Sequence, residues 1–325
     1  MKPSERIFMG WTLGAATLAA TVAVFLIARE ARDPGPGPAW RYDVSSFQSV
    51  DPALLAYRET GRFHLGFTNA RGLAVDARDH IYAVGDHAVR VFDADGTLRR
   101  SRDLPGAPRC IAVAVDGRVL VGIGNRVAVW HPEDDRLEQW EETGTRGRIT
   151  SIAVLDDTVL VADAGNRSVS IHGLDGTRHA VLVPSPQSDT DPGLVVPSPH
   201  LDVAFAPDGS VRVVNPGRLR IEAWTLDGRQ LWTWGQASFG INGFSGCCNP
   251  TDIAILASGK VVTSEKGLPR IKVHQDGSGE LLAVVAGPEA FDEKAAGIDL
   301  AVDSQDRILA LDPLRGEAVT YEKKP

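Results

Sequence analysis

The sequence lacks any concentration of positive charge. Its 34 lysine and arginine residues are interspersed with 42 aspartate and glutamate residues, and the formal net charge is −8 at pH 7. Because a nucleic-acid backbone needs clustered positive charge for binding, we do not expect nucleic acid as a partner.

The chain also lacks signs of long helices after its N-terminal segment. Beyond residue 60, no stretch long enough for an amphipathic helix repeats its apolar residues with a period of about 3.6. The 33 glycines and 20 prolines instead indicate many turns. With 43% hydrophobic residues, the chain can still bury a full-sized core. These features predict a β-rich protein.

Familiar catalytic motifs are missing as well. The sequence contains no Ser–His–Asp spacing, no zinc signature, no CxxCH haem motif and no phosphate-binding loop. This absence favours a binding function over an enzymatic one and leaves the second open.

What the chain does contain is a pattern that occurs six times. Each copy begins with a short apolar run that carries an alanine, followed by a turn and a second apolar run. The alanines are Ala74, Ala112, Ala153, Ala204, Ala254 and Ala301. A unit of about forty residues with four short strands is typical of a propeller blade. The pattern therefore predicts an all-β, six-bladed β-propeller.

The last copy of the pattern is incomplete. It supplies three strands and then the chain ends, which would leave an unpaired edge. The segment 55–67 lies before the first blade and alternates in polarity. We expect this segment to add the missing strand and close the ring.

Several segments resemble NHL repeats. They include Gly72–Asp76, Val89–Gly96, Leu160–Val169 and Val203–Gly209. The resemblance covers residues 71 to 325 and implies a six-bladed propeller. The family ranges from protein-binding modules to a few lyases and hydrolases, so the resemblance supports a fold and not a reaction.

The N-terminus carries an uncharged run at residues 7–28. At about 1.5 Å per residue, this run is long enough to cross a bilayer as a helix. Arg29 and Glu30 follow at once without a convincing cleavage site, which favours an uncleaved signal anchor over a cleaved signal peptide. We expect a cytoplasmic head at 1–6, a transmembrane helix at 7–28, a Pro/Gly linker at 29–39 and an extracytoplasmic propeller at 40–325. In a bacterium this location would be periplasmic.

Three consecutive blades carry an aspartate just before the first apolar run: Asp202, Asp252 and Asp299. In a propeller these positions lie at the mouth of the central channel. We define the top face as the face formed by the loops that enter each first strand and those that join the second and third strands. Converging oxygen ligands suit Ca²⁺ or another divalent cation, whereas single aspartates at such turns also accept backbone N–H groups. His200 precedes Asp202 and is a candidate base or ligand at the same mouth.

The loop at 238–250 interrupts the regular spacing and contains adjacent cysteines, Cys247 and Cys248. Neighbouring Cα atoms are about 3.8 Å apart, below the usual disulfide span of about 4.4–6.8 Å, so a disulfide between them would be a strained ring. The alternatives are a redox-active pair, a soft-metal site, a thiol adduct with a partner, or a purely structural pair. Cys110 occupies the mouth position of the second blade.

A second insertion, at 183–199, enters the top face beside the first. Long loops on a rigid scaffold commonly carry recognition. The candidate binding residues are His200, Cys110, Cys247, Cys248, Asn249, Glu265, Lys266 and Arg270. We expect a membrane-anchored binding or scaffold module for a protein or small-molecule ligand. The alternatives are a metal-assisted lyase or lactonase at the channel mouth, and a redox accessory protein that uses the cysteine pair.

Overall fold

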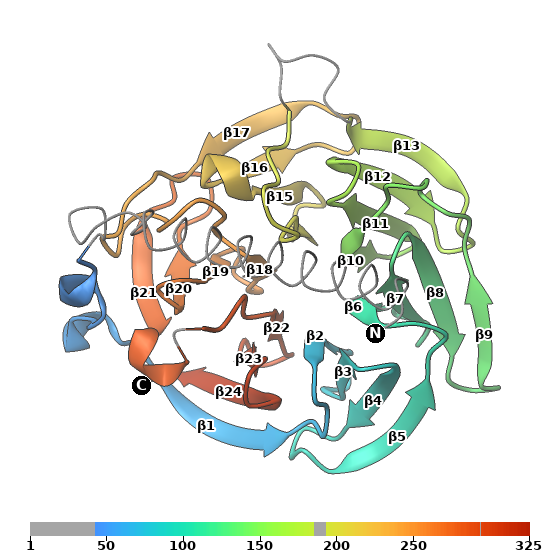
Figure 1. Cartoon of the computed structure of the whole chain (residues 1–325), viewed down its shortest axis with the longest axis horizontal. Helices are drawn as coiled ribbons and strands as arrows, with labels where there is room; N and C mark the ends of the chain where they lie inside the picture. Colours follow the sequence, from blue (N-terminus) through green and yellow to red (C-terminus); the bar gives the residue numbers. More distant parts are fainter. Residues whose placement is uncertain (1–42, 185–192, 293) are drawn as a thin grey trace, which may run out of the picture. The chain divides into compact units, whose positions relative to one another are not determined.

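The computed structural model describes residues 43–184, 193–292 and 294–325. Residues Ser45–Pro325 form one compact unit, and this unit is a ring of six antiparallel sheets with four strands each (Figure 1). The expectation of an all-β six-bladed propeller is confirmed. Within the described residues no helix is long and apolar enough to span a bilayer. The expected anchor at 7–28 and linker at 29–39 lie outside these residues.

The first three blades follow the chain in order. Blade 1 consists of β2 (Ala70–Val75), β3 (Ile81–Gly85), β4 (Ala88–Phe92) and β5 (Leu98–Asp103). Blade 2 consists of β6 (Pro108–Val113), β7 (Val119–Ile123), β8 (Arg126–His131) and β9 (Arg136–Gln139). Blade 3 consists of β10 (Ile149–Leu155), β11 (Thr158–Asp163), β12 (Ser168–Gly173) and β13 (Arg178–Val183).

The next three blades complete the ring. Blade 4 consists of β14 (Val203–Phe205), β15 (Val211–Asn215), β16 (Arg220–Trp224) and β17 (Gln230–Trp234). Blade 5 consists of β18 (Asp252–Ile255), β19 (Val261–Glu265), β20 (Arg270–His274) and β21 (Leu281–Ala286). Blade 6 consists of β22 (Leu300–Val302), β23 (Ile308–Asp312), β24 (Glu317–Lys323) and β1 (Tyr57–His64). The short 3₁₀ helices are η2 (Ser45–Phe47), η3 (Pro52–Leu54), η4 (Pro216–Arg218) and η5 (Pro288–Ala290).

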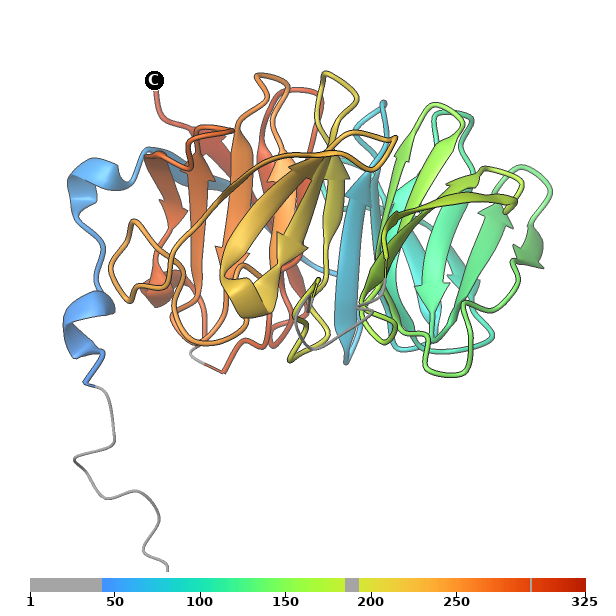
Figure 2. The same cartoon turned by 90° about the horizontal axis from the view of Figure 1, so that it is seen from above.

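Burial follows the position of a strand within its blade. All five residues of β3 are buried, and this strand is an almost continuous apolar run. The outer strand β5 carries arginines and is mostly exposed. An inner strand is covered on both faces by the neighbouring blades, whereas the outer strand faces water, so the two require different sequences. Figure 2 shows the blades edge-on, side by side around the ring.

The hydrophobic core lies between the blades. One cluster joins Tyr82 and Val91 of blade 1 to Ile111 and Trp130 of blade 2. Similar clusters fill the other gaps around the ring. Because each blade buries its faces against its neighbours, the stability of every blade depends on closure of the ring.

Closure is provided by the N-terminal strand, as expected from the incomplete last repeat. β1 pairs antiparallel with β24, from Tyr57 opposite Lys323 to His64 opposite Glu317. Phe63 of β1 also packs on the blade-1 turn at Gly96, which has φ 87°. A Cβ at this glycine would lie 2.5 Å from the Phe63 ring, so the turn and the closing strand both require glycine there.

We predict that Tyr57→Ala destabilises the whole ring. Tyr57 is 7% exposed and packs in the cluster that joins blades 5 and 6. Loss of a buried aromatic side chain costs about 3 kcal/mol, measurable as a lower free energy of unfolding in urea. The matched control is Arg58→Ala on the same strand, whose ion pair with Glu322 is largely exposed. We expect the control to change stability by less than about 1 kcal/mol. Equal effects of the two substitutions would contradict the closing role of β1.

Candidate functional site

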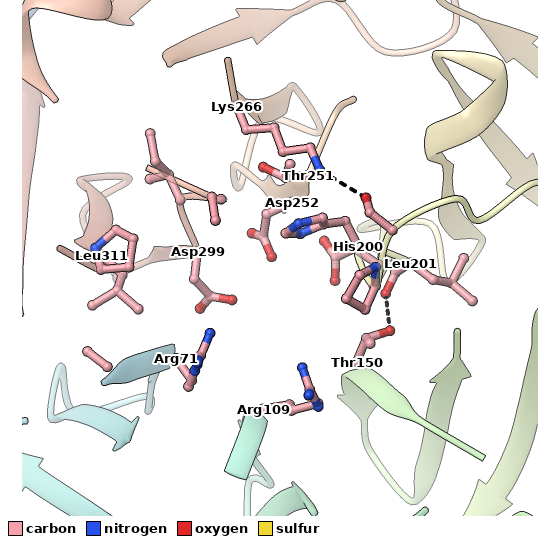
Figure 3. Close-up of a pocket in the computed structure, with 18 of the residues that line it drawn as sticks. Arg71, Arg109, Thr150, His200, Leu201, Thr251, Asp252, Lys266, Asp299 and Leu311 are labelled. Carbon is pink, nitrogen blue, oxygen red and sulfur yellow. Dashed lines mark hydrogen bonds between the residues drawn. The ribbon is translucent and has the colours of Figure 1, made fainter. Parts of the chain in front are cut away.

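A pocket of about 400 Å³ opens at the axis on the top face of the propeller (Figure 3). In each blade one residue lies at the mouth of the channel: Gly72, Cys110, Ser151, Asp202, Asp252 and Asp299. The residue directly before each of these lines the pocket. These residues are Arg71, Arg109, Thr150, Leu201, Thr251 and Ile298. The pocket also contains Asp202, Asp252 and Asp299, together with His200 and Lys266. The structure thus brings five of the sequence-predicted residues into one pocket.

β-bulges direct three of these side chains. In blades 1 to 3, the first two strands shift register between Ala70 and Gly72, between Pro108 and Cys110, and between Ile149 and Ser151. Each shift leaves one residue without a partner: Arg71, Arg109 and Thr150. A bulge re-aims the extra residue, and here all three residues line the pocket.

The three aspartates fasten neighbouring blades together. The Asp202 carboxylate accepts the backbone N–H of Ile253 at 2.7 Å, which links blade 4 to blade 5. Asp252 accepts the N–H of Leu300 at 2.9 Å, and Asp299 accepts that of Leu73 at 2.6 Å. The last bond joins blade 6 to blade 1 and closes the ring. We call these contacts the blade latches.

Blades 1 to 3 do not have an aspartate at the position equivalent to Asp202, Asp252 and Asp299, which we call the latch position. Ser151 of blade 3 accepts the N–H of Val203 through its hydroxyl at 3.3 Å. Blade 1 has Gly72 and blade 2 has Cys110, and neither supplies a carboxylate. The acidic half of the pocket therefore comes from blades 4 to 6 alone.

Burial raises the pKa of each latch aspartate. The pKa of Asp202 is raised to about 6, although bonds from Ser151 and Ile253 oppose the shift. The pKa of Asp299 is raised to about 7 by burial and by the charge of Asp202, against the Leu73 N–H bond. For Asp252, burial and the charges of Asp202 and Asp299 raise the pKa well above its ordinary value. The hydrogen bond between the Asp252 and Asp299 side chains adds to the rise in the pKa of Asp252 and opposes that of Asp299, so of the pair Asp252 holds a shared proton more strongly.

The other half of the pocket is basic. Arg71, Arg109 and Arg148 come from blades 1, 2 and 3, and Figure 3 shows Arg71 and Arg109 extending toward the aspartates. No described residue forms an ion pair with any of the three side chains. Burial lowers the pKa of Arg109, and the charges of Arg148 and Arg71 add to this effect. The pocket is therefore polarised, with uncompensated cations facing a partly protonated acidic wall.

His200 and Lys266 lie between the two halves. Burial lowers the pKa of His200 to about 4, and the charges of Lys266 and Arg109 contribute. The imidazole is thus neutral at physiological pH. Lys266 donates a hydrogen bond from Nζ to the Ser198 hydroxyl at 3.0 Å, across the pocket rim.

The expected cation site at Asp202, Asp252 and Asp299 stays a prediction. Within the parts of the chain that the structure describes, no group of three or more His, Cys, Asp or Glu residues is arranged to hold a metal ion. Each latch aspartate already accepts a backbone N–H. Two further oxygen-bearing side chains, at the ends of the second strands of blades 4 and 6, are bound to other residues. Asn215 donates to Glu222 at 2.8 Å, and Asp312 accepts from Arg315 at 2.8 Å.

Glu265 and Arg270 do not contribute to the surface, contrary to the expectation. Both are almost fully buried in blade 5, where Glu265 pairs with Arg270 and Lys272 at 2.8 Å each. Burial lowers the pKa of Lys272 to about 8, against the attraction of Glu265. The group holds the inserted loop: Arg270 donates to the Phe239 carbonyl and Lys272 to that of Gly243.

The cysteines occupy two separate places. Cys110 is 5% exposed and lies behind the pocket wall rather than in it, and burial raises the pKa of its thiol. Cys247 and Cys248 are free thiols on the inserted loop, with their Sγ atoms 3.2 Å apart. Asn249 is 1% exposed and binds the backbone of Lys266, so it is a support of the site and not a surface contact.

Sequence reasoning missed the arginines of the basic wall. Their signal was present, since Arg71 and Arg109 each precede a mouth position directly. In a regular strand these residues would point away from their neighbours at the mouth. The bulges reverse this orientation.

Comparisons with known proteins support the fold alone. No protein-family model matches the chain, and no curated protein does so either. The chain is similar in structure to virginiamycin B lyase from Staphylococcus aureus, with a TM-score of 0.56 and 11% sequence identity. The similarity covers 82% of this chain and 100% of that one. At this identity the likeness carries no activity from one protein to the other.

We predict that Asp252→Asn stabilises the protein at alkaline pH. Because the raised pKa values belong to the folded state, the latch aspartates favour folding below the unfolded pKa of about 3.9. This contribution is lost as pH rises through about 6 to 7, where Asp202 and Asp299 ionise. Asparagine keeps an oxygen for the Leu300 N–H and a donor for Asp299, and it cannot acquire the negative charge that destabilises the folded state when Asp252 ionises beside Asp202 and Asp299. Around pH 8, we expect Tm to rise by about 2–4 °C, the effect of about 1 kcal/mol.

The control is Asp157→Asn, at an exposed turn position. Differential scanning fluorimetry across about pH 5 to 8 would compare the three proteins. From pH 5 to pH 8, the Tm of the wild type and that of the control should decrease by the same amount. The Tm of Asp252→Asn should decrease less. A wild-type profile that rises toward alkaline pH in parallel with the variant would contradict the shared-proton arrangement.

Proposed function

We propose that this chain is a binding propeller whose axial pocket holds a small ligand with an anionic group, such as a carboxylate or a phosphate. The observation that carries the proposal is the set of three pocket arginines, Arg71, Arg109 and Arg148, without an ion-pair partner among the described residues. Guanidinium groups bind carboxylate and phosphate with two parallel hydrogen bonds. An anion at this wall would also relieve the repulsion that lowers the pKa of Arg109.

The acidic wall, formed by Asp202, Asp252 and Asp299, indicates which chemical group the other end of the ligand carries. Asp202 and Asp299 line the pocket with carboxylate oxygens, and Asp252, whose pKa is raised by burial and by the charges of the other two, lies beside them. A ligand with a hydrogen-bond donor or a positive group opposite its anionic group would match this polarity. A cavity of about 400 Å³ suits a small molecule, which we favour over a protein as the occupant.

Membrane attachment belongs to the same proposal and rests on the sequence. The uncharged run at 7–28 is long enough for a single transmembrane helix, and the Pro/Gly segment at 29–39 is suited to a spacer. We therefore assign the propeller to the extracytoplasmic side, which is the periplasm in a bacterium. This assignment agrees with a role in capturing a ligand outside the cytoplasm.

A metal-assisted lyase or lactonase has less support. Its aspartates, Asp202, Asp252 and Asp299, each hold a neighbouring blade, and Glu265 is enclosed in an ion cluster. The solved lyase with a similar fold adds nothing to this alternative, because fold alone does not transfer a reaction.

We predict that Arg71→Ala combined with Arg109→Ala weakens anion binding at least about tenfold, which corresponds to about 1.4 kcal/mol. Titration calorimetry on the full-length protein would measure this, with citrate and inorganic phosphate as probes. Binding should weaken as salt is added, because exposed charges are screened. The two residues are exposed or half-buried, so the variant should keep the Tm of the wild type.

The matched control is Arg178→Ala combined with Arg229→Ala, two exposed arginines outside the pocket. This control removes the same charge and should leave affinity within about twofold. If both double variants bind the probes equally, the attraction is a general charge effect and the pocket is not the site. Absence of any citrate or phosphate binding to the wild type would also contradict the proposal.

A further inference from the structure

The adjacent cysteines form a second chemical centre, separate from the wall residues of the pocket. Cys247 is exposed, whereas Cys248 is 4% exposed. Their thiols are in hydrogen-bond contact, with Sγ atoms 3.2 Å apart. In an extended strand, neighbouring side chains point to opposite faces. Here both sulfurs point to the same side, because Gly246–Cys248 form a bend.

The bend is fastened at both ends by buried residues. Ser245 is 3% exposed, and its N–H donates to the buried Glu265 carboxylate at 2.8 Å. The Asn249 side chain donates to the Ser245 carbonyl at 2.6 Å and accepts the Lys266 N–H at 2.9 Å. Gly246, with φ 70°, supplies the left-handed backbone that the bend requires. The two sulfurs are therefore held together before any reaction occurs, which favours chemistry that joins them.

We propose that Cys247 and Cys248 form a thiol–disulfide exchange site for small anionic disulfides. The Cys247 thiolate attacks one sulfur of the incoming disulfide, forming a mixed disulfide and releasing the first thiol. The Cys248 thiolate then attacks the Cys247 sulfur, closing the vicinal disulfide and releasing the second thiol. The two cysteine protons end on the two released thiols, and the incoming disulfide is reduced by two electrons.

Exposure sets the order of the two steps. An external disulfide reaches Cys247 from solvent, while Cys248 is shielded and within contact distance of the Cys247 sulfur. Cys110 does not compete, since it is buried in blade 2 among Gly122 and Ile149. The reverse reaction, with a small thiol as reductant, uses the same two sulfurs.

Lys266 accounts for the preference for an anion. Its backbone is bound to Asn249, directly after the cysteine pair. The contact with Cys248 and burial raise the pKa of the Cys247 thiol, and the charge of Lys266 opposes this rise. Its ammonium group lies at the pocket rim, bound to Ser198. A disulfide that carries carboxylates is drawn to this cation, whereas a cationic disulfide is repelled.

Oxidised glutathione, an anionic disulfide, and cystamine, a cationic one, are the probes for the test. The full-length protein is reduced, freed of reductant and mixed with each probe, and intact mass and denatured thiol content are followed over time. We expect the wild type to fall from three thiols to one without a lasting adduct. Peptide mapping should then show the Cys247–Cys248 linkage, a readout that needs no variant.

Variants separate the roles of the two cysteines. Cys248→Ser should stop at a mixed disulfide with one glutathione on Cys247, and Cys247→Ser should react at least about tenfold more slowly, which corresponds to about 1.4 kcal/mol in the barrier. Lys266→Gln should reduce the rate advantage of glutathione over cystamine. Cys110→Ser is the control and should fall from two thiols to none at the wild-type rate.

Three results would overturn the proposal: a stable glutathione adduct on the wild type, equal rates for Cys247→Ser and the wild type, or disulfide-linked dimers as the main product. A preference for cystamine would overturn the assignment to anionic disulfides. The first three results do not depend on whether the axial pocket binds an anion.

Discussion

The ring depends on hydrogen bonds at its axis, where one blade holds the backbone of the next. Asp202, Asp252 and Asp299 accept N–H groups from the inner strands of blades 5, 6 and 1. Their bonds cross long stretches of chain, up to the 226 residues between Leu73 and Asp299. A buried backbone N–H without a partner would be costly, and in blades 3 to 6 a side chain at this position supplies the acceptor. Carboxylates meet this requirement at the cost of their own desolvation, which appears as raised pKa values.

The pocket has an acidic and a basic half because only some of the blades use an aspartate to accept the backbone N–H of the next blade. Three carboxylates in consecutive blades crowd one half of the mouth, and burial together with the charges of Asp202 and Asp299 raises the pKa of Asp252. Blades 1 and 2 have Gly72 and Cys110 at the latch position, and their bulges turn Arg71 and Arg109 into the other half. The same inner-strand segments thus build the ring and line the site. Because of this coupling, we expect substitutions of the three aspartates to alter both ligand binding and stability.

Between blades 4 and 5 the loop at 238–250 interrupts the regular repeat, and a buried group of charged residues holds this loop in place. Glu265, Arg270 and Lys272 are enclosed in blade 5 and bind the backbone of the inserted loop. Such a group stabilises only when every donor and acceptor is satisfied, and here the loop supplies the missing acceptors. The loop in turn presents Cys247 at the surface with Cys248 beneath it. An internal ionic network therefore determines the geometry of an external thiol pair.

The sequence by itself determined the six blades, the closing strand and the positions of the mouth aspartates. These features follow from local patterns: strand alternation, turn residues and the repeat spacing, all of which act within about forty residues. Only the tertiary structure decided that Arg71 and Arg109 face the pocket, that Glu265 and Arg270 are buried, and that the pKa of Asp252 is raised. Each of these outcomes depends on side chains from other blades, far away in the chain. Register shifts, desolvation and the sharing of a proton are properties of that packing, and no local pattern encodes them.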